Sequence, residues 1–161
     1  MPKGSPASKR PLMETYRGCQ LPPDRSYDIE GDLWVKFEGD LVRLGMTDVA
    51  QTRMGKMVSI LFKKAGKRLK AGASVATVES AKWVGPIHTP FAGEVVEINQ
   101  EAYDADILIA NRDPYEAGWI TVMRPDDIEA PHRPLLGGEE VLGPYTERID
   151  ELGISCFRCE D

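Results

Sequence analysis

Short alternations of apolar and polar residues run through most of the chain and predict a mainly β protein. Residues 27–37 carry Leu33, Val35 and Phe37 at alternate positions, which is typical of a strand with one buried face. A Glu-Gly-Asp turn leads from this segment into a second apolar run, 41–44. The two segments therefore predict an antiparallel hairpin.

A second hairpin is predicted around Lys82, between the extended runs 75–78 and 83–90. It is flanked by two segments of the form Gly-x-φ-Val-x-Ile, where φ is apolar, at 55–60 and 93–98. Such an internal repeat indicates one supersecondary unit used twice. We therefore expect two antiparallel sheets with quasi-two-fold symmetry, and a hairpin that displays Lys82 at its tip.

Two short helices interrupt this β pattern. Residues 47–54 predict one helix, with Thr47 as its N-cap and Gly55 at its end. Residues 144–152 predict another, because Tyr, Ile and Leu recur there at helical spacing between charged residues. The prolines and glycines of 131–138 predict a linker before the second helix.

Composition narrows the class of protein. The 161 residues are 42% hydrophobic and 29% charged, an ordinary globular balance for one domain. A net charge of −6 argues against a nucleic-acid footprint, and no apolar run is long enough for a membrane span. The basic, glycine-containing segment 63–72 predicts a solvated connection in preference to a docking patch. His88 and His132 have no partners at metal-ligand spacing, so we expect no metal site.

Four motifs around Lys82 resemble the glycine cleavage H proteins, which are lipoyl carriers. The sequence Glu-Ser-Ala-Lys at 79–82 is similar to the lipoylation motif of that family. Further similarities lie at 45–51, 89–99 and 111–119, in the order that the family has them. The resemblance covers roughly residues 27–124. It implies a mainly β, lipoyl-domain hybrid barrel-sandwich.

The same resemblance implies a lipoate joined covalently to Lys82 by an amide, with Glu79 as the handle for a lipoate ligase or lipoyl transferase. Biotin carriers have a related fold, but their lysine usually lies between two methionines, whereas Ala81 and Trp83 flank Lys82. The protein is then a non-catalytic carrier, since the cofactor supplies the chemistry and the protein presents it. We expect a monomer, because a carrier must dock with several partners in turn.

Other segments are similar to a particular subgroup, the H-like lipoate-binding proteins of bacterial sulfur oxidation. These are Tyr-Arg-Gly-Cys at 16–19, the segment 79–86, and Cys-Phe-Arg-Cys at 156–159. That subgroup works with a heterodisulfide-reductase-like complex, so the arm is expected to carry sulfur intermediates. The alternative is a glycine cleavage H protein that carries an aminomethyl group.

The three cysteines are odd in number and follow no apolar signal segment, which predicts a cytoplasmic, reducing compartment and no disulfide scaffold. Cys156 and Cys159 have the spacing of a redox pair that could exchange with the lipoyl disulfide. They could equally be two free thiols on a frayed terminus, or half of a zinc site. A catalytic dithiol would make the protein an enzyme. Whether Cys19 approaches the pair stays open.

The expected organisation has three parts. Residues 1–15 form a disordered tail, 16–130 the lipoyl domain, and 131–161 a linker, short helix and Cys-x-x-Cys tail. Within the domain, 16–24 predict an ordered loop and 103–111 a loop with a short apolar interval.

Overall fold

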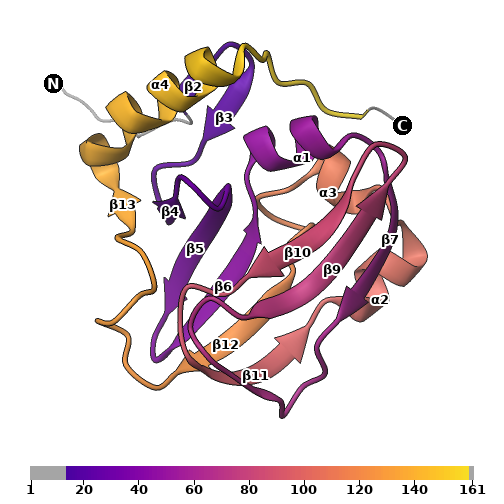
Figure 1. Ribbon diagram of the computed structural model, residues 1–161, viewed down its shortest axis with the longest axis vertical. Helices are drawn as coiled ribbons and strands as arrows, with labels where there is room; N and C mark the ends of the chain where they lie inside the picture. Colours follow the sequence, from indigo (N-terminus) through magenta and orange to yellow (C-terminus); the bar gives the residue numbers. More distant parts are fainter. Residues whose placement is uncertain (1–13, 160–161) are drawn as a thin grey trace, which may run out of the picture.

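The computed structural model describes residues 14–159, and two antiparallel sheets make up most of it (Figure 1). One sheet has seven strands in the order β13-β4-β5-β6-β12-β11-β8, and the other has three in the order β10-β9-β7. The strands are β2 (Glu14–Tyr16), β3 (Cys19–Leu21), β4 (Ser26–Asp28), β5 (Leu33–Glu38), β6 (Leu41–Met46), β7 (Met57–Phe62), β8 (Arg68–Leu69), β9 (Ser74–Ser80), β10 (Val84–His88), β11 (Gly93–Ile98), β12 (Thr121–Pro125) and β13 (Leu136–Gly137). The prediction of a mainly β, two-sheet protein is confirmed.

Short helices connect and cover the sheets. They are α1 (Asp48–Met54), α2 (Gln100–Ala105), α3 (Ile109–Arg112), the 3₁₀ turn η2 (Gly138–Val141) and α4 (Leu142–Leu152). The predicted cap of α1 is confirmed, because the amide of Ala50 donates to Thr47 Oγ1 over 3.2 Å. Gly153 ends α4 with φ +64°, a conformation that glycine adopts without strain. No helix within residues 14–159 is long and apolar enough to cross a bilayer.

The predicted strand 27–37 is wrong in two respects. It is broken into β4 and β5 by a turn in which Asp32 has φ +53°. The expected alternation fails as well, because Trp34 is fully buried and Phe37 is 44% exposed. The ring of Trp34 lies over Gly45, where a Cβ would come within 2.4 Å of it. Both faces of β5 are therefore covered, and a one-sided pattern cannot describe it.

Two predicted loops contain regular structure. Residues 16–24 include β3, which pairs with β2 as a two-stranded ribbon. Residues 103–111 belong largely to α2 and α3, because Tyr103 is buried and its hydroxyl donates to Gly118 O over 2.6 Å. Residues 1–13 of the predicted tail lie outside the described part of the chain.

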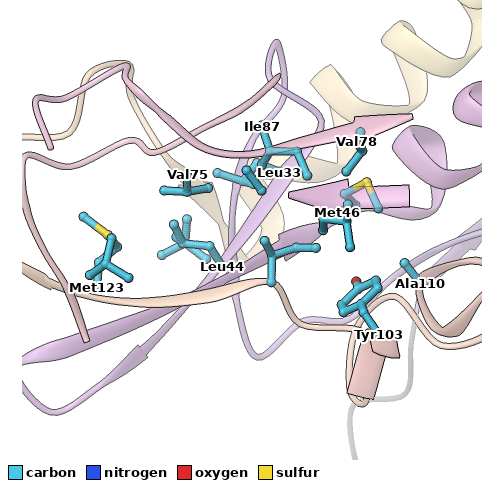
Figure 2. Packing of buried hydrophobic residues seen from close by; sticks show 14 of the residues in the cluster. Leu33, Leu44, Met46, Val75, Val78, Ile87, Tyr103, Ala110 and Met123 are labelled. Carbon is cyan, nitrogen blue, oxygen red and sulfur yellow. The ribbon is translucent and has the colours of Figure 1, made fainter. Parts of the chain in front are cut away.

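The buried residues form two clusters. The first lies between the two sheets and includes Leu33, Leu44, Val78 and Ile87 (Figure 2). The second lies where the chain ends meet the seven-stranded sheet, and it includes Tyr27, Trp34, Tyr115, Tyr145 and Ile149. Burial of these side chains supplies most of the drive to fold.

Residues after 130 contribute to the second cluster. β13 pairs with β4, and α4 buries Tyr145 and Ile149 against that end of the sheet. Figure 1 shows α4 and the β2–β3 ribbon together at one end of the molecule. Two residues of the predicted linker, Leu136 and Gly137, thus form an edge strand of the large sheet, and the separation of 131–161 from the lipoyl domain at residue 130 stays a prediction.

Candidate functional site

Lys82 lies at the tip of the β9–β10 hairpin, as predicted. Val84 pairs with Glu79 across the two strands, and the amide of Ser80 donates to Trp83 O over 2.7 Å. The side chain of Lys82 is exposed. An exposed amine on a short turn is accessible to an acylating enzyme.

Ser80 fixes the tip with a single hydroxyl. Its Oγ donates to Met54 O over 2.6 Å, and it accepts hydrogen bonds from the amides of Lys82 and Trp83 at 3.2 and 3.1 Å. Ser80 is buried, so these bonds are shielded from water. The hydroxyl therefore joins the Lys82 turn to the last residue of α1. Ser80 belongs to the Glu-Ser-Ala-Lys motif at 79–82, but the sequence alone predicts no role for it.

Gly55 ends α1 directly beneath the lysine. Its φ of +81° favours glycine, and a Cβ there would lie 2.9 Å from Cε of Lys82. Asn111 holds this corner, because its Nδ2 donates to Gly55 O over 2.8 Å and its Oδ1 accepts the amide of Met57 over 3.0 Å. The Lys82 stem thus lies over a backbone that is fixed on both sides.

Glu79 lies on the outer face of the three-stranded sheet, and Ser59 Oγ donates to its Oε1 over 3.1 Å. Glu79 is exposed and three residues before Lys82. It is therefore accessible from the same direction as the tip.

A cavity of ≈ 430 Å³ lies between the hairpin and the α1 side of the large sheet. Trp83, next to the lysine, lines it together with His88. Its apolar wall is formed by Leu33, Met46, Ala50, Met54, Val78, Pro86 and Ile87. The cavity is large enough for a small apolar ring.

Arginines engage the buried carboxylates at the polar side of this cavity. Asp32 accepts hydrogen bonds from Arg53 over 3.0 Å and from Arg148 over 2.9 and 3.0 Å. Asp28 is held in the same way by Arg133 at 3.1 and 2.8 Å. These hydrogen bonds hold the pKa of Arg148 and of Arg133 above the ordinary value. Both guanidinium groups therefore stay charged.

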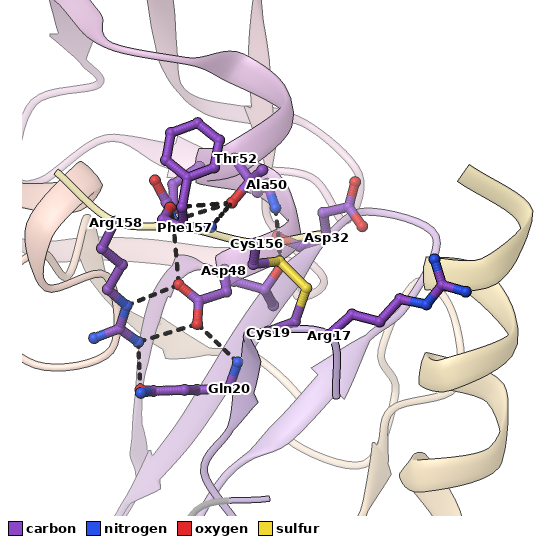
Figure 3. The surroundings of a disulfide bond; sticks show 12 residues. Arg17, Cys19, Gln20, Asp32, Asp48, Ala50, Thr52, Cys156, Phe157 and Arg158 are labelled. Atoms are coloured by element: carbon purple, nitrogen blue, oxygen red, sulfur yellow. Dashed lines mark hydrogen bonds and ion pairs between the residues drawn. A yellow bond between two sulfur atoms is a disulfide. The ribbon is translucent and has the colours of Figure 1, made fainter. Parts of the chain in front are cut away.

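The cysteines differ from the prediction. Cys19 and Cys156 form a disulfide with a Cα–Cα distance of 4.7 Å across 137 residues of sequence (Figure 3). The expectation of no disulfide is wrong, because the chain folds β3 against the C-terminal segment, where the amide of Cys156 donates to Arg17 O over 2.9 Å. Cys159 is the free thiol. A dithiol of Cys156 and Cys159 therefore requires that the disulfide open first.

The C-terminal segment is also not frayed up to residue 159. Arg158 binds both carboxylate oxygens of buried Asp48 at 2.9 and 3.1 Å (Figure 3). The amide of Cys159 donates to Asn111 O over 2.9 Å. His88 contacts Gly72 O through Nδ1 at 2.8 Å. Among residues 14–159, no cluster of three or more His, Cys, Asp or Glu is arranged to hold a metal.

An exposed lysine at the tip of a rigid β-hairpin is the arrangement that a carrier of an acyl-linked prosthetic group requires. The family model "Glycine cleavage H-protein" matches residues 25–147. Glycine cleavage system H protein 2 of Aquifex aeolicus is 42% identical over 145 residues, which are 89% of each chain. Probable glycine cleavage system H protein 2 of Saccharolobus solfataricus is 40% identical over 149 residues, 91% of this chain and 99% of the relative.

A solved structure agrees with these matches. The crystal structure of a glycine cleavage system H protein from Mycobacterium marinum has a TM-score of 0.66 and 32% identity, and the match covers 83% of this chain and 100% of that one. The chain belongs to the glycine cleavage H-protein family. Members of this family are lipoyl carriers without catalytic activity of their own, and they hold lipoate covalently on a lysine. The predicted family and carrier class are thus confirmed.

Proposed function

We propose that Lys82 is the lipoylated residue and that its arm carries sulfur intermediates in cytoplasmic sulfur oxidation, with a heterodisulfide-reductase-like complex as partner. The proposal that Lys82 is lipoylated rests on the position of this residue. Lys82 is exposed, and it lies on the hairpin of a member of this family, at a turn that Ser80 fixes. Amide formation removes the charge of the lysine and ties the arm to a rigid base. A bound lipoyl group supplies a dithiol–disulfide couple.

The cavity beside Lys82 supports a cargo without positive charge. An aminomethyl cargo carries an amine that is protonated at neutral pH, and its storage near protein favours an unpaired carboxylate. Asp32, the buried carboxylate at the cavity, is already bound by Arg53 and Arg148, while Glu30 is exposed at its rim. The indole of Trp83 and the apolar wall suit sulfur, which packs favourably on aromatic rings.

The names of the relatives leave room for a different cargo. The names of two relatives end in the number 2, so their organisms have more than one protein with that name. An organism with several such proteins can use one of them for another reaction. The alternative, a glycine cleavage H protein that carries an aminomethyl group, is favoured by the printed words of the same names.

Attachment of the arm requires a lipoate ligase or a lipoyl transferase. Glu79 is the proposed recognition residue, because it is exposed three residues before Lys82 and its position is fixed by Ser59. A monomeric carrier suits sequential docking with this enzyme and with the redox complex.

The test begins with the intact mass of the protein from its own source and peptide mapping around Lys82. We expect a lipoyl-sized increment on Lys82, with additional sulfur bound. The Lys82→Arg variant keeps the positive charge and cannot take the arm, so it is the matched control. An unmodified Lys82 in native material would overturn the carrier assignment.

The cargo is tested separately. A Lys82→Arg strain is expected to lose thiosulfate oxidation and keep glycine cleavage. Normal thiosulfate oxidation in that strain would remove the sulfur proposal. Glycine–bicarbonate exchange supported by the lipoylated protein would establish the alternative.

A further inference from the structure

Positive charge is concentrated in the part of the chain that builds the hairpin. The chain has 20 Lys and Arg and 26 Asp and Glu. Residues 49–93 contain eight of the basic residues and one acidic residue, Glu79, which leaves 12 basic and 25 acidic residues elsewhere. Within residues 14–159, this acidic protein therefore has one strongly basic region, and Lys82 lies within it. Lipoylation of Lys82 removes only one of the eight positive charges.

Several of these charges are uncompensated. Among the residues that the structure describes, no salt bridge involves Lys56, Lys64, Lys67 or Lys70, and all four are exposed. Lys56 precedes β7 at the end nearest the tip, and Lys64 follows β7 at the other end. The segment 63–72, predicted as a solvated connection, thus adds charge beside the hairpin sheet.

The outer face of this sheet exposes large apolar side chains among polar ones. The strand register places Pro86, Thr77 and Leu61 in one row across the sheet. The neighbouring row contains Val84 and Ser59 on either side of Glu79. Leu61 is 74% exposed and Val84 is 63% exposed. Exposed apolar side chains that lie together beside charged residues are typical of a contact surface.

We infer that this docking face, defined by Leu61, Val84, Pro86, Lys56 and Lys64, receives the enzyme that acylates Lys82. A lysine side chain reaches only a few ångströms from its backbone. The acylating active site must therefore come to the tip, and the enzyme covers the adjoining sheet. Enzymes that act on the far end of the arm have no such constraint. The inference rests on the proposed lipoylation of Lys82.

The apolar and basic residues of the docking face indicate which side chains the surface of the partner must have. An apolar centre that covers Leu61 and Val84 excludes water there. Carboxylates around it complement Lys56, Lys64 and Lys67, and attract the basic region before contact is made. The charges then raise the association rate, and the exposed apolar side chains stabilise the complex after it has formed.

The test measures kcat/KM for acylation of the unlipoylated protein by a lipoate ligase from the source organism, at low and at high salt. The variant is Lys56→Glu with Lys64→Glu and Lys67→Glu. A matched control reverses three cations outside residues 49–93, Arg17→Glu with Lys36→Glu and Arg124→Glu, and changes the net charge equally. We expect kcat/KM at low salt to fall about 10- to 100-fold in the first variant, and by much less at high salt, because salt screens exposed charges.

A second variant separates the apolar contribution. Leu61→Ser with Val84→Thr is expected to raise KM about tenfold and to leave the salt dependence unchanged. Because both residues are exposed, the urea midpoint should not move. The rate at which acetic anhydride modifies Lys82 controls for the reactivity of the amine itself.

The other results of these kinetic measurements would contradict either the docking face or the proposed function. Equal losses in the two charge variants would overturn the docking face, because only total charge would matter. Normal acylation of both the charge and the apolar variant would overturn it as well, and so would co-sedimentation with phosphatidylglycerol vesicles that only the lysine variant loses. If the ligase does not acylate the wild-type protein at Lys82, the proposed function fails before the docking face is tested.

Discussion

The two layers on the large sheet are held in different ways. The hairpin layer, made of β7, β9 and β10, exposes apolar side chains, and unpaired lysines lie at both ends of β7. In the terminal layer, made of the β2–β3 ribbon, α4 and residues 153–159, Arg148 and Arg158 bind buried carboxylates, and the Cys19–Cys156 disulfide joins the ribbon to the C-terminal segment. One layer satisfies its polar groups within the molecule, and the other leaves a surface for a partner. The difference separates stability from recognition.

Helix α1 connects the two layers. At its start, Asp48 binds Arg158 of the terminal layer and accepts the amide of Gln20 over 2.8 Å. At its end, Met54 O accepts the hydroxyl of Ser80 in the hairpin layer. The two layers are therefore bound to opposite ends of one helix of seven residues.

The largest expected difference comes from removing one carboxylate in each layer. Asp48→Ala leaves Arg158 and a backbone amide without their buried partner, which we expect to cost about 3–5 kcal/mol of unfolding free energy. Glu79→Ala removes an exposed group and should change stability by less than about 0.5 kcal/mol. Urea unfolding measures both. Equal losses would contradict the division of roles between the layers.

Opening the disulfide tests the terminal layer alone. Cys19→Ser with Cys156→Ser is expected to lower the unfolding free energy by about 2–4 kcal/mol, because the bond closes a long loop in the unfolded chain. Cys159→Ser is the matched control and should have little effect. Acylation of Lys82 in the double variant should match the wild type at temperatures where the protein is folded. A large fall in acylation would show that the layers are coupled through α1.

Alkaline pH should affect the terminal layer first. Burial raises the pKa of three tyrosines in the second cluster, Tyr27, Tyr115 and Tyr145. In the first cluster it raises the pKa of one tyrosine, Tyr103. A folded-state pKa above the unfolded value of 10.0 gives stability that is complete below pH 10 and is lost as the pH rises further. The loss is about 1 kcal/mol per tyrosine between pH 10 and 11.

Hydrogen exchange at these pH values provides the measurement. Amides of α4 and β3 are expected to lose protection before those of β7 and β9. Simultaneous loss would mean that both clusters unfold as one cooperative unit.

Local patterns in the sequence predicted the hairpin, α1 and α4, because each depends on residues close together along the chain. The second cluster was not predictable in this way. Trp34 belongs to it only because Gly45 and the distant Tyr115 leave room for the ring. The disulfide likewise joins residues 137 apart, and no spacing rule finds it. At the site, Lys82 was predicted from the motif, whereas the tie from Ser80 to Met54 depends on how α1 packs against the hairpin.

The smallest expected effect concerns this tie. Ser80→Ala removes the hydroxyl that serves Met54 O and the amides of Lys82 and Trp83, and we expect a loss of about 1 kcal/mol of unfolding free energy. Ser59→Ala is the matched control, because that hydroxyl bonds only an exposed carboxylate on the docking face.

The two serines should differ more in acylation than in stability. Without its three bonds the lysine turn has no fixed position relative to α1, so kcat for acylation should fall severalfold in Ser80→Ala. Ser59→Ala releases Glu79, the proposed recognition residue, and should therefore change KM and leave kcat unchanged. Steady-state kinetics with the lipoate ligase at a temperature well below unfolding gives the comparison. If both variants acylate at the wild-type rate, the position of the lysine is set by the enzyme after docking, and Ser80 serves only the fold.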